Sequence, residues 1–493
     1  MPERTFRLAS RAGVVVLATA LLSLFLTAAA NAADSIYWVN TEGDKISHAN
    51  LGEGGGADVP IAGAPVGGPN GVAIDAAAGR LYWVNLDDNT IRYANLDGSG
   101  AGLLNTAGAT VDSVAGLAID PLGDRLYWAN SIVNKISFAN LNGSGGGDLN
   151  TAGATLNRPA GLVVSPSNGR IYWSNYAGDA ISFTNLNGSG GGGNLDTAGA
   201  TVDGPEGVAI DPTSSRIYWA NYDSSTIAYA SLSGGGGGLL DTAGVPVSSP
   251  VGLAIGFAST IYWANYGNDS IAYTSLSGGP RGQVGTTGAT LNGAAFPVLL
   301  ERPHFTEYPA VLGKHKPGST LTCSQGTWTA DRVESFLSLA PQSFSYQWFR
   351  NGKAIAGATT AGIVASKVGI YSCTVTAANF AGAENAVSAV DFPVNATVGF
   401  KKVTYNRKKG TATLRVAVTG TGRLDLYGKG VANALRKKAK GTAKLIVRAS
   451  GRARIKLAKT GKAKVKARIS YTPEGGKAIT RFKAIVLKKK RSR

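Results

Sequence analysis

The stretch GLAIDPLGDRLYWANSIVNKISFANLNGSG, residues 116–145, decides the fold, because variants of it recur through the first 300 residues. At its centre a Tyr-Trp pair is followed by a small residue and an asparagine, and in later copies an apolar segment precedes the pair. A repeat near 45 residues built from short strands is typical of a β-propeller blade. The pair occurs six times, 44 to 46 residues apart, with its tryptophans at Trp38, Trp83, Trp128, Trp173, Trp219 and Trp263.

The two ends of the repeat array predict how a ring would close. The first unit starts at Ile36 without an opening strand, and residues 293–300 follow the sixth unit where another opening strand is due. We therefore expect this last segment to complete the first blade and close six blades into a ring. Pro297 argues against this closure, because proline belongs at the edge of a sheet.

These units resemble the YWTD, or class B, repeat of the low-density-lipoprotein receptor family over residues 34–300. The resemblance implies a six-bladed propeller. This chain has Val, Ala or Ser and then Asn where the family has Thr and then Asp, so six carboxylates that the family uses in structural hydrogen bonds are missing. Asparagine can still form hydrogen bonds, so we expect the fold to persist, but a receptor-like choice of ligand does not carry over.

Residues 1–32 are predicted to be a signal peptide. Arg4, Arg7 and Arg11 precede an apolar run over residues 12–27, and Ala30-Asn31-Ala32 offers the small residues that a signal peptidase accepts. We expect cleavage after Ala32 and a secreted or cell-surface protein. The alternative is that the segment stays attached as an N-terminal anchor.

An immunoglobulin-like (Ig-like) domain with a disulfide bond is predicted over residues 301–396. Cys323, Trp348, Tyr371 and Cys373 appear in the order of an immunoglobulin-like sandwich, with the tyrosine two places before the second cysteine. The segment also resembles Ig-like modules of bacterial surface and secreted proteins. A redox-active pair would need a Cys-x-x-Cys spacing, which is absent, so we expect a structural disulfide between Cys323 and Cys373.

Residues 397–493 form a strongly basic region. Residues 401–493 hold 30 of the chain's 49 Lys and Arg and only 2 of its 30 Asp and Glu. Basic and apolar residues alternate, as over residues 462–469, which predicts strands with one buried and one basic face. We expect a small β-sandwich-like domain, and the region resembles basic C-terminal domains of bacterial secreted proteins.

Such a charge excess favours a polyanionic partner. We expect this partner to be an anionic polymer of the cell envelope. A basic surface that only keeps the protein soluble is the alternative. Nucleic acid is a further alternative, against which the small number of aromatic residues available for base stacking argues. The whole chain is therefore expected to be all-β: a six-bladed β-propeller over residues 33–300, the Ig-like sandwich and the basic domain.

The repeated Tyr-Trp and Ile-x-aromatic rows are expected to be packing, so residues that differ between blades are the candidates for binding. In the YWTD family the loops after each Tyr-Trp-x-Asn and the connections into each opening strand surround the ligand-binding face. Tyrosines and carboxylates there suit a basic or sugar-bearing partner. The alternative is that they are solvated turns. The candidate residues are Asp87, Asp88, Arg158, Tyr176, Asp179, Glu206, Tyr222, Asp223, Tyr266 and Asp269.

We expect a binding protein for an extracellular protein or glycan, with no catalytic residues, no metal site and no cofactor. The alternatives are a propeller enzyme of the lactonase or lyase type and a structural envelope spacer. The propeller's one histidine, His48, falls in the aromatic packing row. Asp75, Asp120 and Asp211 could hold a cation such as calcium, but we expect them to terminate strands.

Overall fold

The computed structural model describes residues 34–490 except 53, 121, 212, 330–340 and 391. The predicted signal peptide lies outside the described residues. The chain divides into two compact units. The first contains the chain up to His304 together with Trp328–Ser343 and Ala377–Glu384, and the second contains Phe305–Thr327, Phe344–Thr376 and Asn385–Arg493. The domain boundaries that we place after residues 300 and 396 stay a prediction.

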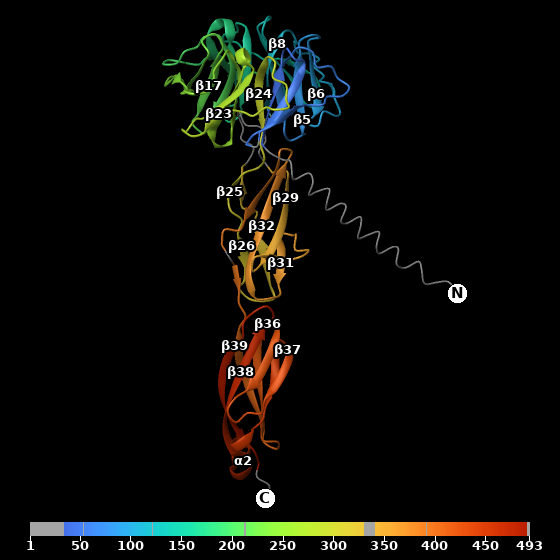
Figure 1. Cartoon of the computed structure of the whole chain (residues 1–493), viewed down its shortest axis with the longest axis vertical. Helices are drawn as coiled ribbons and strands as arrows, with labels where there is room; N and C mark the ends of the chain where they lie inside the picture. The colour runs from blue at the N-terminus through green and yellow to red at the C-terminus, as the bar shows by residue number, and fades with distance from the viewer. Residues whose placement is uncertain are drawn as a thin grey trace, which may run out of the picture. The chain divides into compact units, whose positions relative to one another are not determined.

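The first unit contains six antiparallel four-stranded sheets (Figure 1). The first sheet joins the N-terminal strands to the last strand of the array: β24 (Ala294–Leu300), β1 (Ser35–Asn40), β2 (Lys45–Asn50) and β3 (Gly56–Asp58). Each of the other five is four consecutive strands. They are β4–β7 (Pro69–Asp75, Arg80–Asn85, Thr90–Asn95, Gly102–Leu103), β8–β11 (Val114–Asp120, Arg125–Asn130, Lys135–Asn140, Gly146–Asp148), β12–β15 (Pro159–Ser165, Arg170–Asn175, Ala180–Asn185, Gly193–Asn194), β16–β19 (Pro205–Asp211, Arg216–Asn221, Thr226–Ser231, Gly238–Leu239) and β20–β23 (Pro250–Gly256, Thr260–Asn265, Ser270–Ser275, Arg281–Gln283).

Three short 3₁₀ turns interrupt the blades among the described residues: η1 (Tyr176–Gly178), η2 (Phe257–Ser259) and η3 (Tyr266–Asn268). The prediction of six blades is confirmed. So is the closure of the ring, because β24 pairs antiparallel with β1, with Leu300 opposite Ser35 and Ala294 opposite Asn40. The register shifts between Tyr37 and Val39, opposite Pro297. Proline is tolerated here because β24 is an edge strand and the bulge interrupts the ladder of hydrogen bonds.

The six tryptophans are completely buried, and each indole belongs to the packing between blades. The asparagine that follows each Tyr-Trp is also buried and takes over a structural role. In the fourth blade Asn175 Oδ1 accepts hydrogen bonds from Asn157 N (3.0 Å) and Trp173 Nε1 (3.3 Å), and its Nδ2 donates to Ser182 Oγ (2.8 Å). Asparagine therefore tethers the incoming loop to the middle of its blade.

A second set of polar side chains links each blade to the next. Each side chain sits at a residue with φ between +43° and +52° and accepts a hydrogen bond from a backbone N–H of the following blade. The loops after Tyr-Trp-x-Asn are thus partly structural. The six pairs are Asp44–Gly68, Asn89–Ser113, Asn134–Arg158, Asp179–Gly204, Ser225–Ser249 and Asp269–Gly293.

The Ig-like pattern corresponds to small sheets that a disulfide connects. One sheet holds β26 (Val311–Gly313), β27 (Ser319–Cys323) and β31 (Gly362–Ala365). The other holds β30 (Lys353–Ala354), β29 (Ser343–Arg350), β32 (Gly369–Asn379), β33 (Gly382–Val387) and β34 (Phe392–Val394), and β25 (Phe305–Glu307) pairs with β28 (Thr327–Trp328). The predicted Cys323–Cys373 disulfide joins β27 to β32.

Two further contacts match the immunoglobulin-like pattern. Trp348 is fully buried, and its Nε1 donates to Thr360 O at 2.9 Å. The Tyr371 hydroxyl donates to Lys367 O at 2.9 Å, which is the tyrosine-corner contact typical of these sandwiches.

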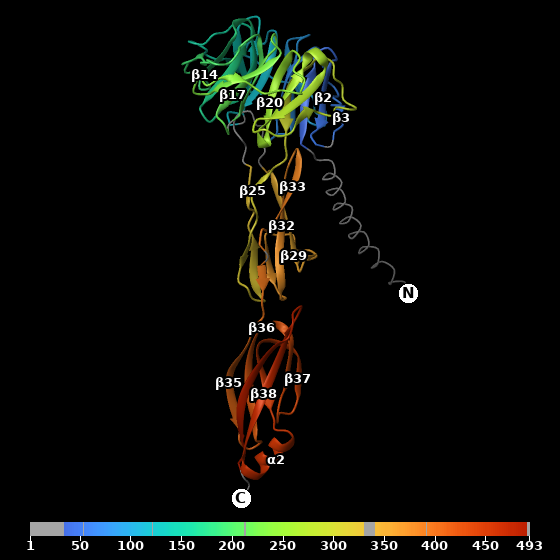
Figure 2. The ribbon, with the colours of Figure 1, turned by 60° about the vertical axis from the view of Figure 1, so that its left-hand side comes forward.

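The basic region is a sheet of long strands, which Figure 2 labels β35 to β38. Its strands are β35 (Val398–Asn406), β36 (Thr411–Tyr427), β37 (Ala434–Val447), β38 (Lys462–Pro473) and β39 (Ile479–Lys488). Along β38 the residues alternate between exposed and buried, as predicted. Apolar residues from each of the five strands form one buried cluster.

Besides its strands the basic region contains one α-helix, α2 (Gly451–Thr460), which the sequence analysis does not predict. Its Leu457 is buried and Ala453 packs against the same cluster, four residues apart on one helix face. Gly461 ends it in the left-handed region at φ +73°. Among the described residues no helix is long and apolar enough to cross a membrane.

Candidate functional site

The candidate site lies at one end of the propeller channel, where the opening strands of the blades begin. In each blade the first residue of the opening strand pairs with the buried asparagine, so the six strands share one register. The second residues line the mouth of the channel. They are Asn70, Ala115, Ala160, Glu206, Val251 and Ala295, so one of the six carries a charge.

The third residues of these strands close the ring by direct backbone packing. Five are glycines, Gly71, Gly116, Gly161, Gly207 and Gly252, and the sixth is Phe296. A Cβ atom on Gly207 would lie 2.1 Å from the Cα of Gly252, and one on Gly161 would lie 2.7 Å from the Cα of Gly207. Glycine is required because neighbouring blades approach here more closely than any side chain allows.

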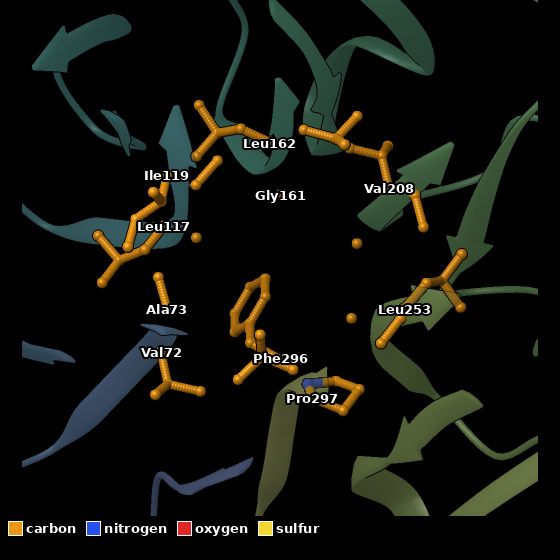
Figure 3. Close-up of a pocket in the computed structure, with 18 of the residues that line it drawn as sticks. Val72, Ala73, Leu117, Ile119, Gly161, Leu162, Val208, Leu253, Phe296 and Pro297 are labelled. Atoms are coloured by element: carbon orange, nitrogen blue, oxygen red, sulfur yellow. The ribbon is translucent and has the colours of Figure 1, made fainter. Parts of the chain in front are cut away.

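Phe296 departs from the glycine ring and plugs the channel. Its ring stands within the circle that Val72, Leu117, Leu162, Val208 and Leu253 form (Figure 3). The residue adopts φ +46° and is 8% exposed. It lines both the narrow apolar channel, of about 100 Å³, and the mouth pocket, of about 340 Å³. The mouth pocket therefore has an apolar floor and no wide passage beneath it.

Three tyrosines from successive blades form a row along the wall of this pocket. The ring centroids of Tyr176 and Tyr222 lie 6.3 Å apart, and those of Tyr222 and Tyr266 lie 6.4 Å apart. The outer two hydroxyls donate to carboxylates, Tyr176 to Asp223 Oδ1 at 3.2 Å and Tyr266 to Glu42 Oε1 at 2.5 Å. The hydroxyl of the middle one, Tyr222, has no hydrogen-bond partner among the described residues.

Arg158 and Glu206 supply the charges of the pocket. The Arg158 guanidinium lies over the ring of Tyr176, with its Cζ 4.7 Å from the centroid. Burial raises the pKa of Glu206 to about 7, Arg158 opposes this change, and Asp223 adds to it. No hydrogen bond from a described residue reaches the Glu206 carboxyl group. The pocket thus holds the Glu206 carboxyl group and the Tyr222 hydroxyl, neither of which forms a hydrogen bond with a described residue, beside the rings of the three tyrosines.

The structure brings together some of the predicted binding residues and separates the others. Arg158, Tyr176, Glu206, Tyr222 and Tyr266 line the mouth pocket, and Asp223 contacts it through Tyr176. Asp179 and Asp269 instead form the links between blades. Asp87 lies against Gly67, and Asp88 pairs with Arg92 at 2.8 Å, outside the pocket lining.

Sequence reasoning missed several residues of the pocket. Phe296 and the second residues other than Glu206 were not recognised, although an alignment of the six units shows that Phe296 is an exception at its position. Glu42 escaped notice because it belongs to the first blade and reaches Tyr266 of the sixth only through ring closure. Thr41, Asn70 and Ser131 complete the polar lining.

The remaining polar candidates have structural roles. Asp75, Asp120 and Asp211 accept hydrogen bonds from backbone N–H groups two or three residues ahead, as expected of residues that terminate strands. His48 stacks on Tyr37 at 5.1 Å within the packing row, and burial lowers its pKa while Asp58 opposes this. Across the described residues, no group of three or more His, Cys, Asp or Glu is placed to hold a metal ion.

No protein-family model matches the chain, and no curated protein matches its sequence. Among solved structures, the chain is similar to one in a nidogen–laminin complex, with a TM-score of 0.45 and 18% identity over 54% of this chain and 98% of that one. It is also similar to virginiamycin B lyase from Staphylococcus aureus, with a TM-score of 0.36 and 15% identity over 72% of this chain and all of that one. Both TM-scores lie below 0.5, so the propeller assignment rests on the six sheets and their closure.

Proposed function

We propose that the chain is a secreted or cell-surface binding protein whose channel mouth holds part of a protein or glycan. The observation that carries this proposal is the pair of uncommitted groups, the Tyr222 hydroxyl and the Glu206 carboxyl, in one pocket. Both side chains are half-buried in the pocket and form no hydrogen bond with a described residue, so their polar atoms can bond a ligand in place of water.

The shape and chemistry of the pocket favour a ligand group with both polar and flat apolar surface. The tyrosine row gives rigid contact area, and Phe296 gives an apolar floor. A pyranose ring or a lysine or arginine side chain has these properties, and a basic group would pair with Glu206. The disulfide supports an oxidising environment, in which an exported protein would meet such partners.

In this proposal the basic region supplies a second contact, with an anionic component of the cell envelope. Its support is the excess of Lys and Arg over residues 401–493. The two contacts are chemically separate, so each can be removed without the other.

The test compares ligands captured from cell-surface extracts and from a glycan array by the full chain and by two variants. Tyr222→Ala removes the middle of the tyrosine row, and Tyr405→Ala removes a 48% exposed tyrosine on β35 as a control. We expect any ligand of the channel mouth to bind Tyr222→Ala about tenfold or more weakly, as for an aromatic residue at the centre of an interface, and to bind the control unchanged. A ligand set that is identical for all three proteins contradicts the proposal.

A further inference from the structure

A hollow lies in the basic region, beside α2. Its volume is about 860 Å³, and it is lined by α2, by the segment at Lys429 and Gly430, and by β38 and β39. β38 pairs with β36 only from Arg468 onward, so along the first half of β38 the backbone groups on that edge do not pair with β36. Along this edge Lys466 N donates to Lys429 O at 3.3 Å, and α2 packs closely over Gly430.

Five basic side chains converge on this hollow from three segments: Lys429, Arg452, Lys456, Lys464 and Lys466. Among the described residues, none of the five forms an ion pair. The acidic residues of the region are Asp425, which pairs with Arg423, and Glu474, which pairs with Lys367. The positive charge of the hollow is therefore not neutralised by this part of the chain.

The hollow also has an apolar side, part of which lies outside the buried core. Phe482 on β39 is 53% exposed and lies on the basic face of the sheet, with Lys466 Nζ 5.0 Å from its ring centroid. Ala484 and Ala453 continue this surface. On α2 itself Ile455 is 56% exposed among basic neighbours. A helix with basic side chains and an exposed apolar residue suits the boundary between headgroups and acyl chains.

We propose that this hollow binds the headgroup of an anionic phospholipid, with the phosphate among the five basic side chains and the glycerol and upper acyl chain against Phe482. A hydrophilic phosphate polymer would satisfy the cations but leave the exposed Phe482 and Ile455 in water. The combination of cations and apolar surface therefore favours an amphiphile. This inference concerns a different part of the chain from the channel mouth, and it sharpens the proposed envelope contact.

The test measures cosedimentation of the full chain with vesicles of equal parts phosphatidylglycerol and phosphatidylcholine. The pocket variant carries Arg452→Gln, Lys456→Gln and Lys464→Gln. The control carries Lys401→Gln, Lys440→Gln and Lys477→Gln, which removes the same charge from exposed positions outside the hollow. Because both variants keep residues 1–33, any vesicle binding by that apolar segment is common to them.

We expect the pocket variant to bind anionic vesicles at least about tenfold more weakly, and the control to lose about threefold or less, because basic residues near the lipid contribute most. Phe482→Ala, which leaves the charge unchanged, is expected to weaken binding about threefold. Equal losses in the two charge variants would show a diffuse charge effect and overturn the proposal. It is also overturned if soluble glycerol phosphate competes as well as vesicles do, or if duplex DNA but not vesicles binds through the hollow.

Discussion

The propeller and the basic region use charged and polar side chains in opposite ways. In the propeller they serve the fold: Asp44, Asp179 and Asp269 link successive blades, and Asp75 and Asp211 hold turns. In the basic region the Lys and Arg side chains of β38 lie on the exposed face, and the core beneath is formed by apolar residues. The comparison teaches that a charged side chain indicates a binding site only where it does not already form hydrogen bonds or ion pairs that stabilise the fold.

By this criterion the candidate binding positions in the propeller are those where one blade carries a different kind of residue from the other five. Glu206 is the one charged residue among six equivalent positions, and Phe296 replaces a glycine that the other five blades keep. In the basic region, by contrast, the repeated pattern itself places uncompensated charge on the surface. Three substitutions sharpen this difference, each with its counterpart in the other region.

The largest effect is expected from Gly207→Ala. The new Cβ would meet the Gly252 backbone at 2.1 Å, and backbone atoms of adjacent blades cannot move apart without opening the ring. We expect the propeller to lose at least about 3 kcal/mol of stability, at or above the upper end for overpacking. Thermal unfolding followed by circular dichroism measures this loss.

The counterpart is Gly399→Ala on β35, where a Cβ meets nothing within 4 Å and φ is not positive. This change should leave stability within about 0.5 kcal/mol of the parent chain. If Gly207→Ala is tolerated equally well, the glycine ring does not determine how closely the blades pack.

An intermediate effect is expected from Asn175→Ala. It removes a fully buried amide and leaves Asn157 N–H and the Ser182 hydroxyl each short of a hydrogen-bond partner. A loss of about 2 kcal/mol in urea unfolding is expected, because unsatisfied buried groups bear the desolvation cost. Replacing Lys462, an exposed residue of β38, by Ala should change the midpoint little, and an equal shift for both would contradict the structural role of the asparagine.

The smallest effect concerns pH and Glu206. Its pKa in the folded chain, about 7, lies above the ordinary value of 4.5, so the protonated carboxyl group stabilises the fold at low pH. That contribution is lost as the pH rises through about 7. Glu206→Gln should therefore be more stable than the parent above pH 7, by about 1 kcal/mol once partial solvent exposure is considered, and equal to it near pH 4.

Measuring unfolding midpoints of the two proteins from pH 4 to pH 9 tests this expectation. Lys464→Gln in the basic region serves as the control and should show no such dependence. The difference in unfolding midpoint between Glu206→Gln and the parent could instead stay constant over this range. That result would mean that the carboxyl group titrates as it does in water.

Repetition explains how much of the molecule could be predicted. The spacing of the Tyr-Trp pairs fixes six blades, and the absence of an opening strand before Ile36 predicts the partner that β24 supplies. The Cys323, Trp348, Tyr371 and Cys373 order likewise predicts the disulfide and the tyrosine corner. These features could be predicted because the order and spacing of a few residues in the sequence indicate them, without knowledge of contacts in the folded chain.

The features that could not be predicted depend on contacts between residues far apart in the sequence, or on whether a segment follows the two-residue period of a strand or the 3.6-residue period of a helix. The Tyr266–Glu42 contact exists only because the ring closes, and the plugging of the channel by Phe296 depends on five glycines elsewhere. In α2 the segment Arg452–Lys459 alternates enough to continue the pattern of strands. Packing of Ala453 and Leu457 on the sheet, which the sequence does not display, selects the helix instead.

The closure of the ring by β24 also has a consequence for biosynthesis. Chains fold from the N-terminus as they are made, yet β1 receives its inner neighbour only after the segment at residues 294–300 has been synthesised. Until then five blades and an incomplete first one must coexist with an unpaired strand edge, which invites pairing with other chains. The edge of β1 therefore stays exposed until β24 has been made and has paired with it.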